Sequence, residues 1–218
     1  MLTPVRDLQF FQVLRFATFF LTGILFTKLG LSTYDIGIYE SLFFLGSVLS
    51  FFWLSGLTQS LLANYEPKKK SKEFFNAFLV LSGISVLVFI AFRLLITPYS
   101  FMANNPEVLY FYGTFSFYLL FIGPSFLAEY MLLLKEKTKG LVIYGIVAFG
   151  IQLAAVSVPI ALGYGLEEAM YGLVLSSVVR FIITIGLLIA YAEFKIDSDF
   201  VQQFLATAGP LMVATLLS

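Results

Sequence analysis

Residues 169–192 read AMYGLVLSSVVRFIITIGLLIAYA, an apolar stretch with one arginine at its centre. A helix needs about 20 predominantly apolar residues to cross a bilayer core. Isolated strands are excluded inside lipid because their backbone polar groups would be unpaired. The sequence therefore predicts an all-α, polytopic transmembrane helix bundle. Six further apolar segments belong to it: 8–29, 38–63, 74–96, 108–134, 141–164 and 200–218.

The composition supports a membrane protein and excludes several kinds of chemistry. Of the 218 residues, 60% are hydrophobic and 12% are charged, whereas soluble domains carry about 25% charged residues. The chain has no cysteine and no histidine, which removes thiolate catalysis and the commonest general base and metal ligand. Its formal net charge is zero, so nothing indicates nucleic acid. We expect neither an enzyme nor a metal or cofactor site.

The lysines predict the orientation. They cluster in three short breaks, which we call the lysine loops and which follow segments 38–63, 108–134 and 169–192. The breaks on the other side contain no lysine or arginine. Because cytoplasmic loops carry the excess of basic residues, we expect a cytoplasmic N-terminus and cytoplasmic lysine loops. The lysines concerned are Lys68, Lys69, Lys70, Lys72, Lys135, Lys137, Lys139 and Lys195.

The segment count predicts two parts of unequal size. Residues 1–196 would form a lobe of six transmembrane helices, and residues 197–218 would begin a second lobe. The last segment closes on LMVATLLS without a polar flank, so we expect the chain to be the N-terminal portion of a longer protein. The alternative is a seven-helix protein with a short last helix.

Three segments carry polar residues at helical spacing. Residues at i, i+3, i+4 and i+7 share a helix face, and such stripes face a bundle interior or a cavity. Hydroxyl residues also bind helices together, so the hydroxyls alone leave both interpretations open. The residues expected to line a cavity are Gln12, Thr18, Thr22, Tyr118, Ser125, Ser176, Ser177 and Thr184.

Charges within the segments are the strongest candidates for function, because a charge at membrane depth costs several kcal/mol. Arg15 lies about seven residues into its segment, roughly 10 Å deep. Glu129 lies at a similar depth, so we expect the two to pair. Arg180 lies near the bilayer midplane, where no acidic residue of this chain matches its depth. The sequence therefore predicts that Arg180 meets either an anionic ligand or a partner from sequence beyond this chain. Pro124 is expected to weaken its helix.

The first two segments and the last resemble a known family. They contain TKLG at 27–30, STYD at 32–35, GIY at 37–39, SGLTQSLL at 55–62 and FVQQFLATAGPLMVATLL at 200–217. This pattern is similar to the polysaccharide (O-antigen or oligosaccharide) flippases of the multidrug/oligosaccharidyl-lipid/polysaccharide exporter superfamily. The resemblance implies two helical lobes, related as parallel repeats, around a central cavity.

The resemblance also implies a function. Such a protein moves a polyprenyl-pyrophosphate-linked oligosaccharide across the bacterial inner membrane by alternating access, for the biosynthesis of surface polysaccharide or lipopolysaccharide. Its partners would be that lipid-linked oligosaccharide, membrane lipids, and the polysaccharide polymerase and glycosyltransferases of the pathway. Arg15 and Arg180 would contact the head group. Glu129 would orient Arg15 or couple transport to an ion.

Three alternatives remain at this point. A cation-coupled multidrug exporter of the same superfamily would need an acidic cluster in its cavity. A membrane-embedded polysaccharide ligase or polymerase would need a large outer loop, and no break in this sequence is large. A noncatalytic scaffold subunit would tolerate the loss of Arg180.

Overall fold

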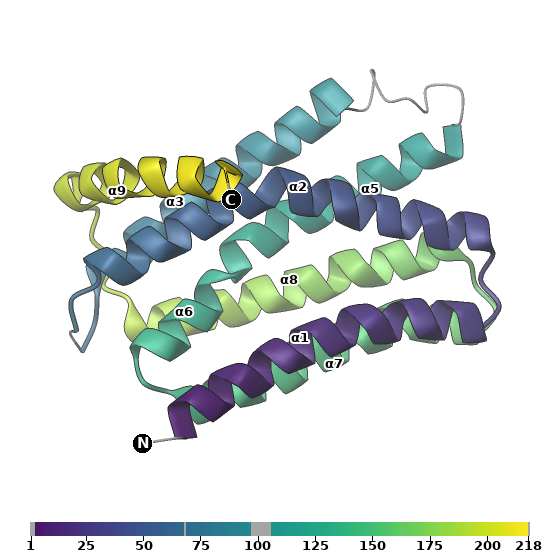
Figure 1. The fold of residues 1–218 in the computed structure, drawn as a ribbon, viewed down its shortest axis with the longest axis horizontal. Coiled ribbons are helices and arrows are strands. Elements are labelled where there is room, and N and C mark those ends of the chain that lie inside the picture. Colours follow the sequence, from purple (N-terminus) through teal and green to yellow (C-terminus); the bar gives the residue numbers. More distant parts are fainter. Residues whose placement is uncertain (1–2, 68, 97–105, 218) are drawn as a thin grey trace.

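The computed structural model describes residues 3–67, 69–96 and 106–217, and these residues form a helix bundle (Figure 1). Seven of the helices are long and apolar enough to cross a membrane. The prediction of an all-α, polytopic bundle is therefore confirmed. The elements are α1 (Thr3–Lys28), α2 (Thr33–Asn64), α3 (Lys72–Ala91), the π-helical turn η1 (Phe92–Ile96), α5 (Pro106–Ser125), α6 (Leu127–Leu134), α7 (Thr138–Ala161), α8 (Leu166–Tyr191) and α9 (Ser198–Leu217).

The predicted segments match the helices, with one break. The segment predicted at 108–134 is divided between α5 and α6 at Phe126, two residues after Pro124. Proline lacks an N–H and its ring clashes with the preceding helical turn, which explains a weakened helix here. The amide of Phe126 instead donates to the carbonyl oxygen of Gly123 at 3.3 Å. The loop predicted at 97–107 falls mostly on residues outside those described.

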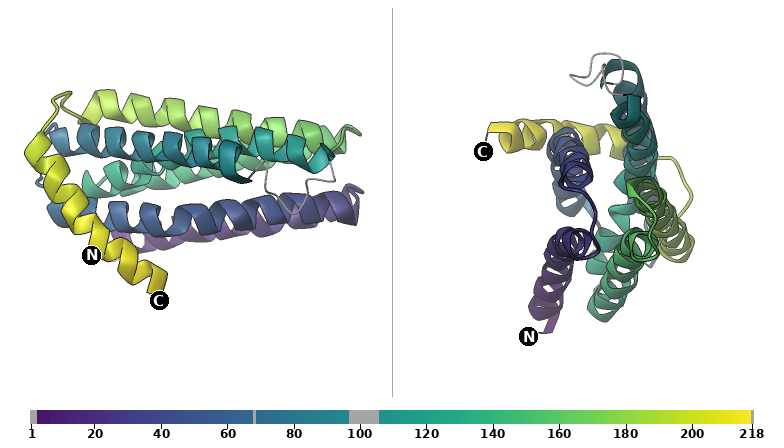
Figure 2. Two further views of the ribbon diagram at one scale, coloured as in Figure 1. Left: turned by 90° about the horizontal axis from the view of Figure 1, so that it is seen from above. Right: turned by 90° about the vertical axis from the view of Figure 1, so that its right-hand side faces the viewer.

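The order of packing differs from the order along the chain. α1 packs along α7, α7 along α8, and α8 along α5, while α2 packs along α9. Most helices run roughly side by side, and α9 crosses them at an angle (Figure 2). Small residues allow close approach: a Cβ atom at Gly172 would lie 1.9 Å from the carbonyl oxygen of Ala155. α6 contacts both α7 and α8, so α1, α6 and α8 all pack against α7.

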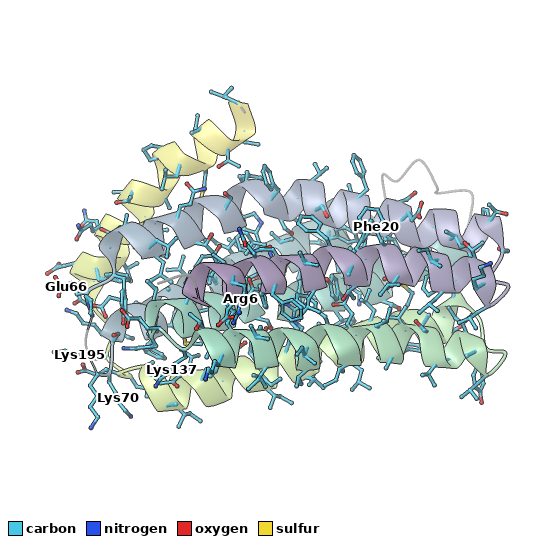
Figure 3. All side chains as sticks on the ribbon, turned by 60° about the horizontal axis from the view of Figure 1, so that its bottom comes forward. Arg6, Phe20, Glu66, Lys70, Lys137 and Lys195 are labelled. Atoms are coloured by element: carbon cyan, nitrogen blue, oxygen red, sulfur yellow. The ribbon has the colours of Figure 1, made fainter. Side chains whose placement is uncertain are left out.

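The lysine loops gather at one end of the bundle, as the alternation along the sequence requires. Figure 3 shows Glu66, Lys70, Lys137 and Lys195 at that end. Lys135 Nζ donates to Ser71 Oγ at 3.1 Å, and the amide of Ser71 donates to the carbonyl oxygen of Tyr191 at 3.0 Å. The three loops therefore lie on the same side. That this side is cytoplasmic stays a prediction.

The last helix is joined to the bundle by α2. Ser60 Oγ donates to the carbonyl oxygen of Phe204 at 2.7 Å. Gly56 faces Met212, whose Cγ would lie 2.4 Å from a Cβ atom at position 56. α9 is thus a packed element of the described structure. The division into a first lobe at 1–196 and a second lobe beginning at 197 stays a prediction.

Candidate functional site

Three charged side chains meet between α1, α6 and α8, and we call them the charge cluster: Arg15, Glu129 and Arg180. Arg15 Nη2 donates a hydrogen bond to Glu129 Oε2, which confirms the expected pair. Arg180 Nη2 lies 3.6 Å from Glu129 Oε1. The expectation that no acidic residue of this chain reaches Arg180 was therefore wrong. That expectation was based on residue positions along straight helices. It did not include the length of the arginine side chain, which carries the guanidinium away from the backbone.

Arg180 is enclosed by polar and aromatic partners from α7. It is only 4% exposed. Its Nε lies 3.4 Å from the hydroxyl of Tyr144, and its Nη1 lies 3.5 Å from Oε1 of Gln152. The guanidinium carbon lies 5.2 Å from the centroid of the Phe149 ring, within the range of a cation–π contact. Arg180 is thus accommodated inside the bundle by neutral groups together with one carboxylate.

The charge cluster carries an excess positive charge. Two arginines and one glutamate sum to +1 when all three are ionised. Glu129 Oε1 is buried, and in the described part of the chain it accepts no hydrogen bond. Arg15 is the most accessible member, with a side chain that is 32% exposed, against 9% for Glu129. An anion approaching the cluster would therefore meet Arg15 first.

A pocket of about 350 Å³ lies beside Arg15. Its walls come mainly from α2, α5 and the start of α6. It combines aromatic rings with hydroxyl and amide groups. The Arg15 guanidinium also lies 5.5 Å from the centroid of the Phe126 ring. The polar residues and aromatic rings of the wall are Arg15, Phe43, Ser47, Ser50, Phe51, Ser55, Thr58, Gln59, Phe115, Tyr118, Phe126 and Tyr130.

Most of the residues predicted to line a cavity are not in the wall of this pocket. Only Tyr118, with Arg15, lies in the pocket wall, and Gln12 is half-buried elsewhere on α1. The hydroxyl residues are buried and donate to carbonyl oxygens of their own helices, a common arrangement for Ser and Thr in helices. These bonds lie within single helices, so both interpretations of the hydroxyl residues stay open. The residues concerned are Thr18, Thr22, Ser125, Ser176, Ser177 and Thr184.

The polar face of α2 was missed by the sequence analysis. Ser47, Ser50, Ser55, Thr58 and Gln59 all contribute to the pocket wall. Their spacing is compatible with one helix face, so the test applied to the other segments would have found them. Without a charged member, this stripe did not stand out from ordinary hydroxyl residues in membrane helices.

Neither family models nor curated proteins match the chain. Within the described ranges, no group of acidic residues is placed to hold a metal ion. The fold and the site define a class: a multi-pass membrane protein with a positively charged cluster beside a pocket between its helices.

Proposed function

We propose that the protein is a transporter that moves a polyprenyl-pyrophosphate-linked oligosaccharide from the cytoplasmic to the outer leaflet of a bacterial inner membrane. The observation that carries the proposal is the position of Arg15. It belongs to a cluster with an excess positive charge and lies in the wall of a pocket between the helices. The resemblance of the first, second and last segments to polysaccharide flippases supports the same function.

The chemistry of the head group fits a cation in this position. A pyrophosphate diester carries negative charge that is costly to bring into a medium of low dielectric constant. The guanidinium of arginine offers paired N–H donors that match phosphate oxygens. Arg15 can therefore compensate for part of the solvation that the phosphate loses when it leaves the aqueous surface. We assign the first contact with the head group to Arg15.

The remaining wall of the pocket suits the sugar that follows the phosphate. Serine, threonine and glutamine side chains of α2 supply hydrogen-bond donors and acceptors for hydroxyl groups. The phenols of Tyr118 in α5 and Tyr130 in α6 add two more hydrogen-bonding groups to the wall. A volume of about 350 Å³ lies at the lower end of the range for small-molecule sites. It suits a head group with the first part of its glycan.

Arg180 has a less direct role in the conformation described. Its guanidinium faces Glu129, Tyr144 and Gln152, and it is not part of the pocket wall. Its contact with the head group stays a prediction, which would require the cluster to rearrange during alternating access. The interruption of the helix between α5 and α6 provides a flexible point beside Glu129.

The rival transporter is less well supported by this geometry. A cation-coupled exporter would need an acidic side chain available to a cation or a proton. Glu129 instead faces two arginines. A scaffold subunit would have no use for a cation in the wall of a pocket. The polymerase and glycosyltransferases of the pathway remain proposed partners, because they would consume and supply the lipid-linked oligosaccharide.

A reconstituted assay tests the proposal. Vesicles carrying the purified protein would contain a fluorescent polyprenyl-pyrophosphate-linked oligosaccharide, and its arrival in the outer leaflet would be followed by quenching. We expect translocation above that of protein-free vesicles, a loss of about tenfold or more in Arg15→Ala, and partial retention in Arg15→Lys. Arg93→Ala is the matched control, because Arg93 stacks on Phe89 and Phe117 outside the pocket. Equal rates with and without protein would refute the proposal.

A further inference from the structure

We propose that Glu129 is a displaceable counter-ion: it holds Arg15 while the pocket is empty, and passes to Arg180 when the anion of the substrate takes Arg15. This inference rests on the proposed function and adds a step to it. It assigns a positioning role to Glu129 and a receiving role to Arg180. It follows from the unequal contacts that the two arginines make with one carboxylate.

Arg15 is the member of the charge cluster that a ligand in the pocket can contact. Arg15 forms part of the pocket wall, whereas neither Glu129 nor Arg180 does. A ligand in the pocket therefore reaches the cluster through Arg15. That arginine already donates to Glu129 Oε2 through Nη2, so a phosphate oxygen that binds at Nη2 competes with this carboxylate for the same donor. In the proposed exchange the anion takes this donor, and its binding releases Glu129.

Arg180 has unused capacity to donate hydrogen bonds to a carboxylate. Its Nη2 lies 3.6 Å from Glu129 Oε1, and this oxygen accepts no hydrogen bond within the described residues. Its contacts to Tyr144 and Gln152 are long, at 3.4 and 3.5 Å. Charge-assisted hydrogen bonds to a carboxylate are about 2.7–2.9 Å long. A movement of roughly 1 Å would therefore convert the loose contact between Arg180 and Glu129 into a strong one.

The backbone that carries Glu129 is interrupted nearby. Glu129 lies in the first turn of α6, an eight-residue helix separated from α5 at Phe126. A short helix next to an interruption can change its orientation without unfolding a long one. The Phe126 ring lies in the pocket wall and under the Arg15 guanidinium. A ligand that displaces this ring would act on Arg15 and on the start of α6 together.

The exchange of Glu129 between Arg15 and Arg180 allows the site both to bind and to release an anionic substrate. An unpaired arginine inside the membrane is costly, so the empty pocket needs an internal anion. If that anion were held too strongly, the substrate could not bind; if it were absent, the substrate would not be released. Glu129 lowers the affinity for the substrate anion and returns to Arg15 when the anion departs.

Binding of farnesyl pyrophosphate to the purified protein in lipid nanodiscs tests the inference, with farnesol titrated in parallel to subtract partitioning into lipid. We expect Glu129→Gln to bind farnesyl pyrophosphate about tenfold more tightly than the wild type, a change that corresponds to about 1.4 kcal/mol. General damage to the fold would weaken binding, so tighter binding separates the two effects. Glu167→Gln, at the exposed start of α8, is the matched control and should leave affinity unchanged.

A second variant keeps the net charge of the cluster constant. Glu129→Gln combined with Arg180→Gln leaves Arg15 alone, and the cluster again sums to +1. We expect this double variant to bind more tightly than the wild type as well, and Arg180→Gln alone to bind more weakly. Equal or weaker binding by the double variant, with the wild type binding, would overturn the counter-ion role only. No binding by the wild type would overturn the proposed function and this inference together.

Discussion

Arg180 Nη2 lies 3.6 Å from Glu129 Oε1, so the arginine at the centre of an apolar helix faces a carboxylate from a different part of the chain. Glu129 is also bound by Arg15. The ion pairs of these three side chains connect α1, α6 and α8, which are separate elements along the sequence. Because of this contact, we interpret Arg180 as an ion-pair partner of Glu129 and not as an unpaired cation that requires a ligand.

The first prediction concerns the stability of the charge cluster. Glu129→Gln leaves two arginines without their carboxylate, and we expect it to lower the free energy of unfolding by about 3–5 kcal/mol. Arg180→Gln leaves Glu129 paired with Arg15, and should cost about 1–3 kcal/mol. The loss of unfolding free energy in the double variant should be smaller than the sum of the two single losses by at least about 0.5 kcal/mol. Denaturation in mixed micelles measures all three; strictly additive effects would show that the two residues are not coupled.

The second prediction concerns the contact between α7 and α8. A Cβ atom at Gly172 would lie 1.9 Å from the carbonyl oxygen of Ala155, which is backbone and cannot move aside easily. We expect Gly172→Ala to lower the stability of the folded protein by about 1–3 kcal/mol.

Gly186 of the same helix is the control for this substitution. A Cβ atom there would meet nothing within 4 Å. Gly186→Ala should be neutral or stabilise the protein by up to about 1 kcal/mol, because alanine favours the helix. Thermal unfolding in detergent compares the two variants. Similar melting temperatures for both would contradict the close packing of α7 on α8.

The third prediction concerns pH and the loop before α9. A hydrogen bond from Lys72, assisted by the amide of Phe200, lowers the pKa of Asp197 below its ordinary value. A carboxyl with a lowered pKa stabilises the fold above its unfolded-state pKa, about 3.9. This contribution is lost as the pH falls through the lower, folded-state pKa. The stability that Asp197 provides should therefore be present at neutral pH and disappear below about pH 4.

Asp197→Asn tests this dependence, because asparagine retains the capacity to cap the first turn of α9 while losing the charge that Lys72 binds. The variant should melt at a lower temperature than the wild type at pH 6, and the difference should shrink as the pH approaches 3. Asp199→Asn is the control. A difference that is constant with pH would rule out the ion pair as its source.

The fourth prediction concerns orientation. The chain has no cysteine, so single-cysteine variants report the side of the membrane without background. We expect Lys69→Cys and Lys137→Cys to react with a membrane-impermeant maleimide only in inverted vesicles. Tyr34, in the first turn of α2, and Tyr164, between α7 and α8, are exposed at the other end. Tyr34→Cys and Tyr164→Cys should react in intact cells. The reverse pattern would place the N-terminus outside.

The fold was largely predictable from the sequence because the bilayer imposes one strong constraint. Spans of about 20 apolar residues must be helices, and the lysine loops set which ends lie together. A weakened helix near Phe126 could be predicted, because Pro124 weakens the helix that contains it. The packing order could not be predicted: that α1 lies along α7, or α2 along α9, depends on side-chain shape and on sites of close approach such as Gly172.

The site was predictable only in part. Arg15, Glu129 and Arg180 were identified because they are charged residues within membrane-spanning segments. The pair of Arg15 and Glu129 was identified because the two lie at a similar depth in the membrane. The contact of Arg180 with Glu129 was missed because it depends on side-chain reach. The pocket was missed because its wall is the hydroxyl face of α2, whose composition is ordinary for a membrane helix. Which polar stripe faces a pocket and which faces a neighbouring helix is decided by packing.

The central claim is that the pocket beside Arg15 binds the anionic head group of a lipid-linked oligosaccharide, and protection of Ser50→Cys tests it most directly. Ser50 lies in the pocket wall, whereas Ser41, on the same helix, lies outside it. We expect the polyprenyl-pyrophosphate-linked oligosaccharide to slow methanethiosulfonate labelling of Ser50→Cys, with no effect on Ser41→Cys and no effect of uncharged polyprenol. Arg15→Ala should abolish the protection. Labelling of Ser50→Cys at the same rate with and without the substrate would contradict the account.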